Sequence, residues 1–377
     1  MLRDLAALIH PDLSRNIVLI TGPRHCGKTS LAKNLGLSTQ HLDYEDCEHR
    51  VTIRDRSWDR KKELIVLDEL HKKPEWKQYL KGLYDLEGIP PAILVTWSAS
   101  LEIHRKLDDS LTGSFSGRFF LYRLHPFDVR ELSSQMEPQE ALERILRVGG
   151  FPEPFLENDG SMYSRWKKSH MDIILRQDLL DLVTVSDLHS MELLLDLLRE
   201  RVGSPLSIAA LARDLRKDAK TVKRWLGILE NLYVVFPVRP WHRNLARSLL
   251  KEPKYYFYDT GQVADSPGPR LENAVACSLL KALHYFEDRD GSERSLHYLR
   301  TRDGREIDFA IVKRDMVSHL IEVGISGEKL SPGFAQLGPS FPDAKRIQLV
   351  LAPARKKTWS TGEELHQAAE WLAGLIV

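Results

Sequence analysis

The chain of 377 residues is long enough for two or three domains of ordinary size. It carries 54 Lys and Arg against 53 Asp and Glu, and this net charge of +1 excludes nucleic-acid binding through a global positive field, leaving only local basic patches. Its three cysteines, Cys26, Cys47 and Cys277, are far apart and odd in number, which excludes a disulfide framework and a zinc site. No apolar run approaches the roughly 20 residues of a membrane span. We therefore expect a cytoplasmic globular protein with no membrane partner.

Residues 22–29 match the phosphate-binding P-loop pattern G-x-x-x-x-G-K-[ST] at every fixed position. An apolar run at 17–20 precedes the loop and predicts a buried strand, and residues 30–35 predict the first turns of a helix. Backbone N–H groups and the helix dipole then point at the phosphates of ATP. We expect Lys28 to reach the β- and γ-phosphates and Thr29 to bind Mg²⁺. The residues expected to surround the nucleotide phosphates are Gly22, Pro23, Arg24, His25, Cys26, Gly27, Lys28, Thr29 and Ser30.

Residues 63–69 form the second motif, in which an apolar run ends in the acidic pair Asp68 and Glu69. This pattern predicts a strand buried on both faces, with the two carboxylates at its carboxyl end, where open α/β sheets bind ligands. It is the Walker B arrangement. We expect Asp68 to hold Mg²⁺ through water and Glu69 to polarise the attacking water.

A third buried strand is predicted at residues 92–95, and polar side chains follow it. Thr96 and Ser98 are candidate sensors of the γ-phosphate or of the attacking water. An alternative stays open, because Ser98 or Ser100 can instead cap a helix predicted at 101–107.

Arg118 precedes an edge strand predicted at residues 119–124. An arginine in this place can serve as an arginine finger on the nucleotide of a neighbouring subunit, which would require a homo-oligomer such as a hexameric ring. The alternative is a surface arginine on a polar loop.

These motifs resemble those of the P-loop ATPases of the AAA+ class, so the expected fold is an α/β core. Further segments resemble a bacterial and archaeal family that pairs an AAA-type ATPase with a C-terminal domain of unknown function. They include residues 114–118, 124–127, 149–154 and 254–261. One departure is Trp97, where the family usually has a small residue.

The remaining chain is predicted to contain three further segments after the ATPase core at 1–135. Residues 136–200 are rich in helix formers and predict a helical lid and connector, interrupted by a loop or hinge at 149–154. Residues 201–250 predict a winged helix-turn-helix, and residues 251–377 a nuclease-like α/β domain.

The predicted winged helix-turn-helix has Ser207 capping a helix at 208–215, a turn at 216–218, a second helix at 219–231 and a strand at 233–238. Basic side chains on the turn and second helix are candidates for contacts with duplex or branched DNA. They are Arg216, Lys217, Lys220, Lys223 and Arg224. Arg239, Trp241, His242, Arg243 and Arg247 extend this surface into a loop. The alternative is a protein-interaction module with a solvated basic face.

The C-terminal segment resembles the PD-(D/E)XK nucleases in the order of its acids: Glu272 on a helix, Asp308 on a strand and Glu322 on the next strand. In those enzymes carboxylates bind Mg²⁺ and a lysine helps to activate water. Gly324 stands at the lysine position, and Lys313 and Lys329 are candidates to replace it. We therefore expect a degenerate nuclease site, kept for DNA binding or assembly. Residues 363–377 predict a terminal amphipathic helix.

The sequence as a whole predicts a Mg²⁺-dependent ATPase that acts as an oligomeric, DNA-binding motor or remodeller. A nucleotide-controlled switch that binds a protein partner is an alternative, and an ATP-regulated nuclease is another.

Overall fold

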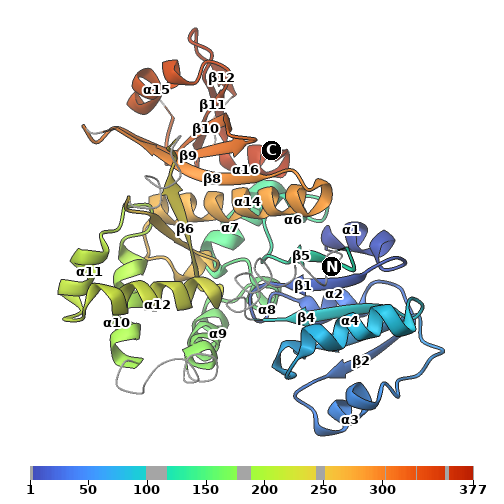
Figure 1. The fold of residues 1–377 in the computed structure, drawn as a ribbon. Helices are drawn as coiled ribbons and strands as arrows, with labels where there is room; N and C mark the ends of the chain where they lie inside the picture. The colour runs from blue at the N-terminus through green and yellow to red at the C-terminus, as the bar shows by residue number, and fades with distance from the viewer. Residues whose placement is uncertain are drawn as a thin grey trace. The chain divides into compact units, whose positions relative to one another are not determined.

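The computed structural model describes residues 3–98, 117–175, 188–242, 251–301, 303–327, 329–352 and 356–376 (Figure 1). It contains two compact units. The first unit comprises Met1–Pro126 and Asn231–Tyr233, and the second comprises Phe127–Glu230 and Val234–Val377. Ser100, the helix predicted at 101–107, Ser116, Arg243 and Arg247 lie outside the described residues.

The first unit is built on a five-stranded, fully parallel sheet in the order β2-β3-β4-β1-β5. The P-loop strand β1 and the acidic strand β3 are therefore not neighbours, because β4 lies between them. Its strands are β1 (Ile17–Thr21), β2 (Thr39–Asp43), β3 (Leu64–Asp68), β4 (Ala92–Trp97) and β5 (Phe119–Arg123). This confirms the predicted α/β fold class and the predicted strands. β2 escaped the sequence analysis because only Leu42 of its five residues is buried.

The helices of this unit are α1 (Leu5–Asp12), α2 (Lys28–Lys33), α3 (Cys47–Asp55), the 3₁₀ turn η1 (Leu70–Lys72) and α4 (Trp76–Glu87). Alternate residues of the central strands form one hydrophobic core with α3 and α4. Trp97 is one of these core residues; it is fully buried, and its ring lies 5.4 Å from that of Trp76. Thr96 and Ser98 flank it in sequence, so strand alternation sends their side chains to the other face. The bulk of Trp97 therefore does not enter the sensor position.

The second unit contains an eight-stranded mixed sheet in the order β12-β13-β11-β10-β9-β8-β6-β7. Its strands are β6 (Val235–Pro240), β7 (Lys254–Phe257), β8 (Arg294–Arg300), β9 (Glu306–Lys313), β10 (Met316–Gly324), β11 (Lys345–Val350), β12 (Lys357–Thr358) and β13 (Glu364–Gln367). β6 pairs with β7 on one side and with β8 on the other. This pairing places strands from the predicted winged-helix and nuclease-like segments in one sheet, and the second unit also contains the helices of the predicted lid. The bounds of the four predicted segments stay a prediction.

Helices make up most of the described residues between 127 and 230. After residue 251 they alternate along the chain with the strands of the sheet. They are α6 (Val129–Leu132), α7 (Pro138–Val148), α8 (Pro152–Glu157), α9 (Gly160–Ile173), α10 (Leu188–Glu200), α11 (Ile208–Asp214), α12 (Ala219–Asn231), α14 (Pro267–Asp290), α15 (Pro332–Leu337) and α16 (Ala368–Ala373), with 3₁₀ turns η4 (Thr260–Gln262) and η5 (Gly338–Ser340). Residues 152–157 are therefore helical and only 149–151 link α7 to α8. The prediction of one terminal helix is wrong for residues 364–367, since they pair with β11 as the strand β13.

Two of the segments that carry the family resemblance, 149–154 and 254–261, meet around one buried carboxylate. Asp259 is 4% exposed and accepts hydrogen bonds from Tyr163 Oη (2.9 Å) and from the backbone N–H of Gly261 (3.2 Å). Gly149 has φ +75°, and a Cβ atom on it would lie 1.9 Å from Asp259 Oδ1. A Cβ atom on Gly261 would lie 2.1 Å from Tyr163 Oη. Both positions therefore require glycine, because a Cβ atom would clash with the neighbouring Asp259 or Tyr163 side chain.

No helix in the described part of the chain is both long and apolar enough to cross a membrane. The cytoplasmic location stays a prediction.

Candidate functional site

The P-loop turns directly from β1 into α2. Gly27 precedes the helix with φ +96°, and His25 also lies in the left-handed region with φ +60°. The Lys28 side chain is buried, and its ammonium donates to the carbonyl oxygens of Gly22 (2.9 Å) and Pro23 (2.8 Å). The lysine is thereby held inside the loop that the sequence predicts to bind phosphates.

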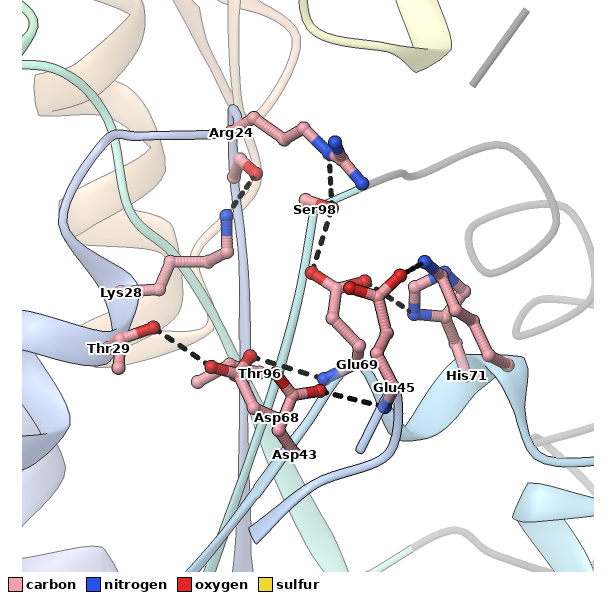
Figure 2. A network of polar contacts seen from close by, with 12 residues as sticks. Arg24, Lys28, Thr29, Asp43, Glu45, Asp68, Glu69, His71, Thr96 and Ser98 are labelled. Carbon is pink, nitrogen blue, oxygen red and sulfur yellow. Dashed lines mark hydrogen bonds and ion pairs between the residues drawn. The ribbon is translucent and has the colours of Figure 1, made fainter. Parts of the chain in front are cut away.

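The structure brings together the two residues predicted to hold Mg²⁺. The Thr29 hydroxyl donates to Asp68 Oδ2 at 2.9 Å, although 39 residues separate them (Figure 2). Asp68 also accepts hydrogen bonds from Thr96 Oγ1 and from His41 Nε2, the latter at 3.1 Å. A carboxylate and a hydroxyl at one point are oxygen ligands of the kind that Mg²⁺ prefers, so the residues present fit this ion.

Hydrogen bonding keeps Asp68 ionised. Burial by itself raises the pKa of its carboxyl, but the hydrogen bonds from His41, Thr96 and Thr29 outweigh burial and lower the pKa to about 2. The side chain is therefore an anion at any pH near neutrality.

Glu69 is held from the end of β4. Ser98 Oγ donates to Glu69 Oε1 at 2.9 Å, and Arg24 Nε of the P-loop donates to Ser98 Oγ at 3.4 Å (Figure 2). Burial raises the pKa of Glu69, while the hydrogen bond from Ser98 opposes this shift. Glu69 also has a left-handed backbone, with φ +51°, a costly conformation for a residue with a side chain. This chain of contacts links the P-loop to the predicted catalytic carboxylate through β4.

Sequence reasoning missed two side chains in this region, His41 and His71. His71 Nδ1 lies 3.4 Å from Glu69 Oε2 but without hydrogen-bond geometry. Burial, followed by the positive charges of Lys72 and Arg24, lowers the pKa of His71 to about 4, so near neutrality it contacts Glu69 as a neutral ring. Glu45 forms an ion pair with Lys72 close by. His41 carries no sequence signal because it lies on the edge strand β2, which has no apolar run.

Arg118 lies at the amino end of β5, whose first residue pairs with Ile17 at the amino end of β1. The P-loop follows the carboxyl end of β1. Arg118 and the P-loop of the same chain therefore lie at opposite ends of these parallel strands. Its Nε donates to Asp85 Oδ1 at 2.6 Å. Its action on a neighbouring subunit stays a prediction.

The candidate DNA-contacting residues lie on α12 and on the turn before it. Ser207 caps α11, as predicted, by accepting from the Ala210 N–H. Arg216 occupies the turn with φ +51°, and four of the five basic residues are exposed: Arg216, Lys220, Lys223 and Arg224. Lys217 is half-buried, with its ammonium 5.6 Å from the centre of the Trp225 ring. The basic side chains thus form one exposed strip, here called the α12 basic strip.

Two acids of the predicted nuclease site, Glu272 and Asp308, converge around a lysine that the sequence analysis missed. The third, Glu322, is not ion-paired with this lysine, and its Oε1 is buried without a hydrogen-bond partner among the described residues. Lys254 Nζ of β7 lies 3.2 Å from Glu272 Oε1 and 3.4 Å from Asp308 Oδ1. It lies 2.6 Å from Oε1 of Glu306, a further acid that was not predicted. Among the described lysines, the one paired with these carboxylates is Lys254, so the suggested replacements Lys313 and Lys329 are wrong.

The pKa values in this cluster follow from burial. Burial by itself would lower the pKa of Lys254, but Glu272, Asp308 and Glu306 raise it above its usual value, so the ammonium stays charged. Burial and the Asp308 charge raise the pKa of both Glu272 and Glu322.

Comparison with known proteins gives two family matches. A family model described as "AAA domain" matches residues 14–133, and one described as "Domain of unknown function (DUF8612)" matches residues 139–265. An uncharacterised protein of Mycobacterium tuberculosis is 30% identical over 264 residues, which cover 69% of this chain and 58% of that relative. The match therefore spans less than two thirds of the relative's own length.

Two solved structures show a weaker similarity. The Aeropyrum pernix ORC1 protein in complex with DNA has a TM-score of 0.33 and 14% identity, covering 72% of this chain and 90% of that chain. AMPPCP-bound DnaA from Aquifex aeolicus has a TM-score of 0.31 and 14% identity, covering 60% and 86%. These low scores carry no argument about function. The chain thus combines an AAA domain at residues 14–133 with a domain of unknown function that follows it at 139–265, in agreement with the resemblance that its motifs gave.

Proposed function

We propose that this protein is a Mg²⁺-dependent ATPase. The observation that carries the proposal is the 2.9 Å hydrogen bond between Thr29 Oγ1 and Asp68 Oδ2, with Glu69 next in the chain. It brings the P-loop and the acidic strand end to the same point, which phosphoryl transfer requires.

Each side chain then has a defined task. The P-loop N–H groups and Lys28 bind and orient the phosphates of ATP, and Glu69 orients the attacking water. Ser98 fixes the direction of the Glu69 carboxylate. Mg²⁺, held by Thr29 and Asp68, would neutralise the charge that develops on the phosphates. Arg118 would act on the nucleotide of a neighbouring copy, so the proposal includes a homo-oligomer.

The proposal extends to DNA, which the α12 basic strip would contact. Four exposed basic side chains on one short segment supply a local positive field that the net charge of +1 does not. ATP hydrolysis would then drive movements that act on duplex or branched DNA.

The first experiment measures ATP hydrolysis with and without duplex and four-way-junction DNA. Wild type is compared with Lys28→Ala and with Lys33→Ala, which removes an exposed lysine from the same helix. We expect DNA to stimulate wild type and Lys33→Ala, and Lys28→Ala to be inactive. A rate of ATP hydrolysis that no DNA changes would instead support a nucleotide-controlled switch that binds a protein partner. Full activity of Lys28→Ala would refute the ATPase assignment.

A further inference from the structure

Lys254 occupies the centre of the acidic cluster in the second unit. Its side chain is 0% exposed, whereas Glu272, Glu306 and Asp308 retain 16–21% of their side-chain exposure. The ammonium is therefore beneath the carboxylates, with three of them within 3.4 Å of its nitrogen. A buried ammonium is tolerated only when carboxylates surround it in this way.

The carboxylate oxygens around Lys254 are also used by other donors. Glu272 Oε1 accepts from Tyr256 Oη at 2.6 Å, and Asp308 Oδ2 accepts from the Val323 N–H at 2.9 Å. Glu306 Oε2 accepts from Arg300 Nη1 at 3.0 Å. Each of these three acids thus accepts a hydrogen bond from the chain in addition to its contact with Lys254, whereas Oε1 of Glu322, the other acid of the predicted site, is buried without a hydrogen-bond partner in the described part of the chain.

The fold fixes the lysine in this place. Lys254 and Tyr256 are two residues apart on β7 and share a face, as Glu306 and Asp308 do on β9. Asn273 ties α14 to β7, because its side-chain amide accepts from the Phe257 N–H (2.8 Å) and donates to the Phe257 carbonyl (2.9 Å). Glu272 is the neighbour of Asn273 and is carried to the same point.

A Mg²⁺ ion does not fit this arrangement. The Lys254 ammonium occupies the point where oxygens of Glu272, Glu306 and Asp308 meet, 2.6–3.4 Å from them, and its positive charge would repel a divalent cation beside it. Among the described residues there is no group of three or more His, Cys, Asp or Glu side chains arranged to hold a metal ion. The chain therefore shares the order of the acids with metal-dependent nucleases but not their metal site.

We propose that the Lys254 ammonium stands where the metal ion of a nuclease would stand, and that this cluster is a closed, metal-free ion cluster without nuclease activity. The cation is the side chain of Lys254 on β7. At the position on β10 where the PD-(D/E)XK nucleases have their lysine, this chain has Gly324. This inference is independent of the proposed ATPase activity.

The first test uses the unmodified protein without nucleotide. Mn²⁺ binding is measured by electron paramagnetic resonance for wild type and Asp308→Asn, and cleavage of supercoiled plasmid is assayed with Mg²⁺ and Mn²⁺. We expect equal Mn²⁺ binding by the two proteins and no cleavage that depends on Asp308. Stoichiometric Mn²⁺ binding or cleavage that is lost in Asp308→Asn would overturn the proposal, whether or not any lysine variant folds.

The second test removes the internal cation. Lys254→Ala leaves the carboxylates without their partner, so we expect a lower melting temperature in EDTA that Mn²⁺ restores, together with newly detected Mn²⁺ binding. The double variant Lys254→Ala/Asp308→Asn should lose that binding. A folded Lys254→Ala protein that binds no Mn²⁺ would show that the lysine does not stand in a metal position.

Discussion

The hydroxyl of Ser98 donates a hydrogen bond of 2.9 Å to Oε1 of Glu69, and it connects β4 to the predicted catalytic carboxylate. Ser98→Ala should therefore lower kcat for ATP by about 10-fold or more, since a hydrogen bond to a charged group is worth about 1.5–3 kcal/mol. The KM for ATP should change little, because Ser98 acts on Glu69. Steady-state kinetics measure both constants, and Glu69→Gln is the reference for full loss. A change confined to KM would contradict the positioning role.

Arg118 lies at the amino ends of the strands, whereas its own P-loop lies at their carboxyl ends. If Arg118 acts on a neighbouring subunit, two inactive variants should complement each other. Lys28→Ala would lack a working P-loop but keep its arginine, and Arg118→Ala would be the reverse. A mixture should recover ATP hydrolysis that neither protein shows alone. Arg15→Ala, which removes an exposed arginine elsewhere in the first unit, should be fully active. If Arg118→Ala is as active as wild type, Arg118 is only a surface partner of Asp85.

The α12 basic strip predicts the salt dependence of DNA binding. Lys220→Glu/Lys223→Glu should weaken binding of every duplex and should reduce the slope of log K against log salt by about 2 or more, since each phosphate contact contributes about 0.9. Fluorescence anisotropy over a salt series measures the slope. Arg165→Glu/Lys168→Glu on α9 makes the same charge change at exposed positions away from the strip. An equal effect of the two pairs would refute a specific contact by α12.

Gly149→Ala should strongly destabilise the second unit. The added Cβ atom would lie 1.9 Å from Asp259 Oδ1, and φ +75° is unfavourable for alanine. We expect a loss of at least about 2 kcal/mol in the free energy of unfolding. Gly160→Ala is the matched control, because nothing lies within 4 Å of its Cβ position at the start of α9. Urea unfolding compares the variants, and equal losses would contradict the crowding at Asp259.

Asp259 should make the protein less stable as pH rises. Burial raises its pKa to about 6, although hydrogen bonds from Tyr163 and Gly261 oppose the shift. A carboxyl whose pKa is higher in the folded than in the unfolded state stabilises the fold when protonated. That stabilisation is lost as pH rises from about 4 through 6, and its total is roughly 2–3 kcal/mol at 1.36 kcal/mol per pKa unit.

Asp259→Asn should remove this component of the pH dependence. The measurement is urea unfolding of both proteins at several pH values between the unfolded and folded pKa of Asp259. The difference in unfolding free energy between the variant and wild type should grow with pH. A constant difference would mean that Asp259 does not titrate in this range.

The nucleotide site was largely predictable because its motifs are local. The P-loop, the acidic pair and Ser98, which follows β4, each come just after a short apolar run, and parallel strands bring the carboxyl ends of such runs together at one end of a sheet. His41 was missed because an edge strand exposed to water needs few apolar residues, so β2 shows no hydrophobic pattern.

The acidic cluster shows the opposite case. The acids Glu272, Asp308 and Glu322 were recognised by their order in the chain, and Gly324 marked the missing lysine. The cation is instead Lys254, 54 residues before Asp308 and on β7, a strand that the sequence analysis did not predict. A short stretch of sequence is enough to predict the P-loop and the buried strands, because both depend on residues that are adjacent in the chain. Which charges meet inside the second unit depends on the pairing of β6 with β7 and β8, and such long-range pairing leaves no pattern in any single segment.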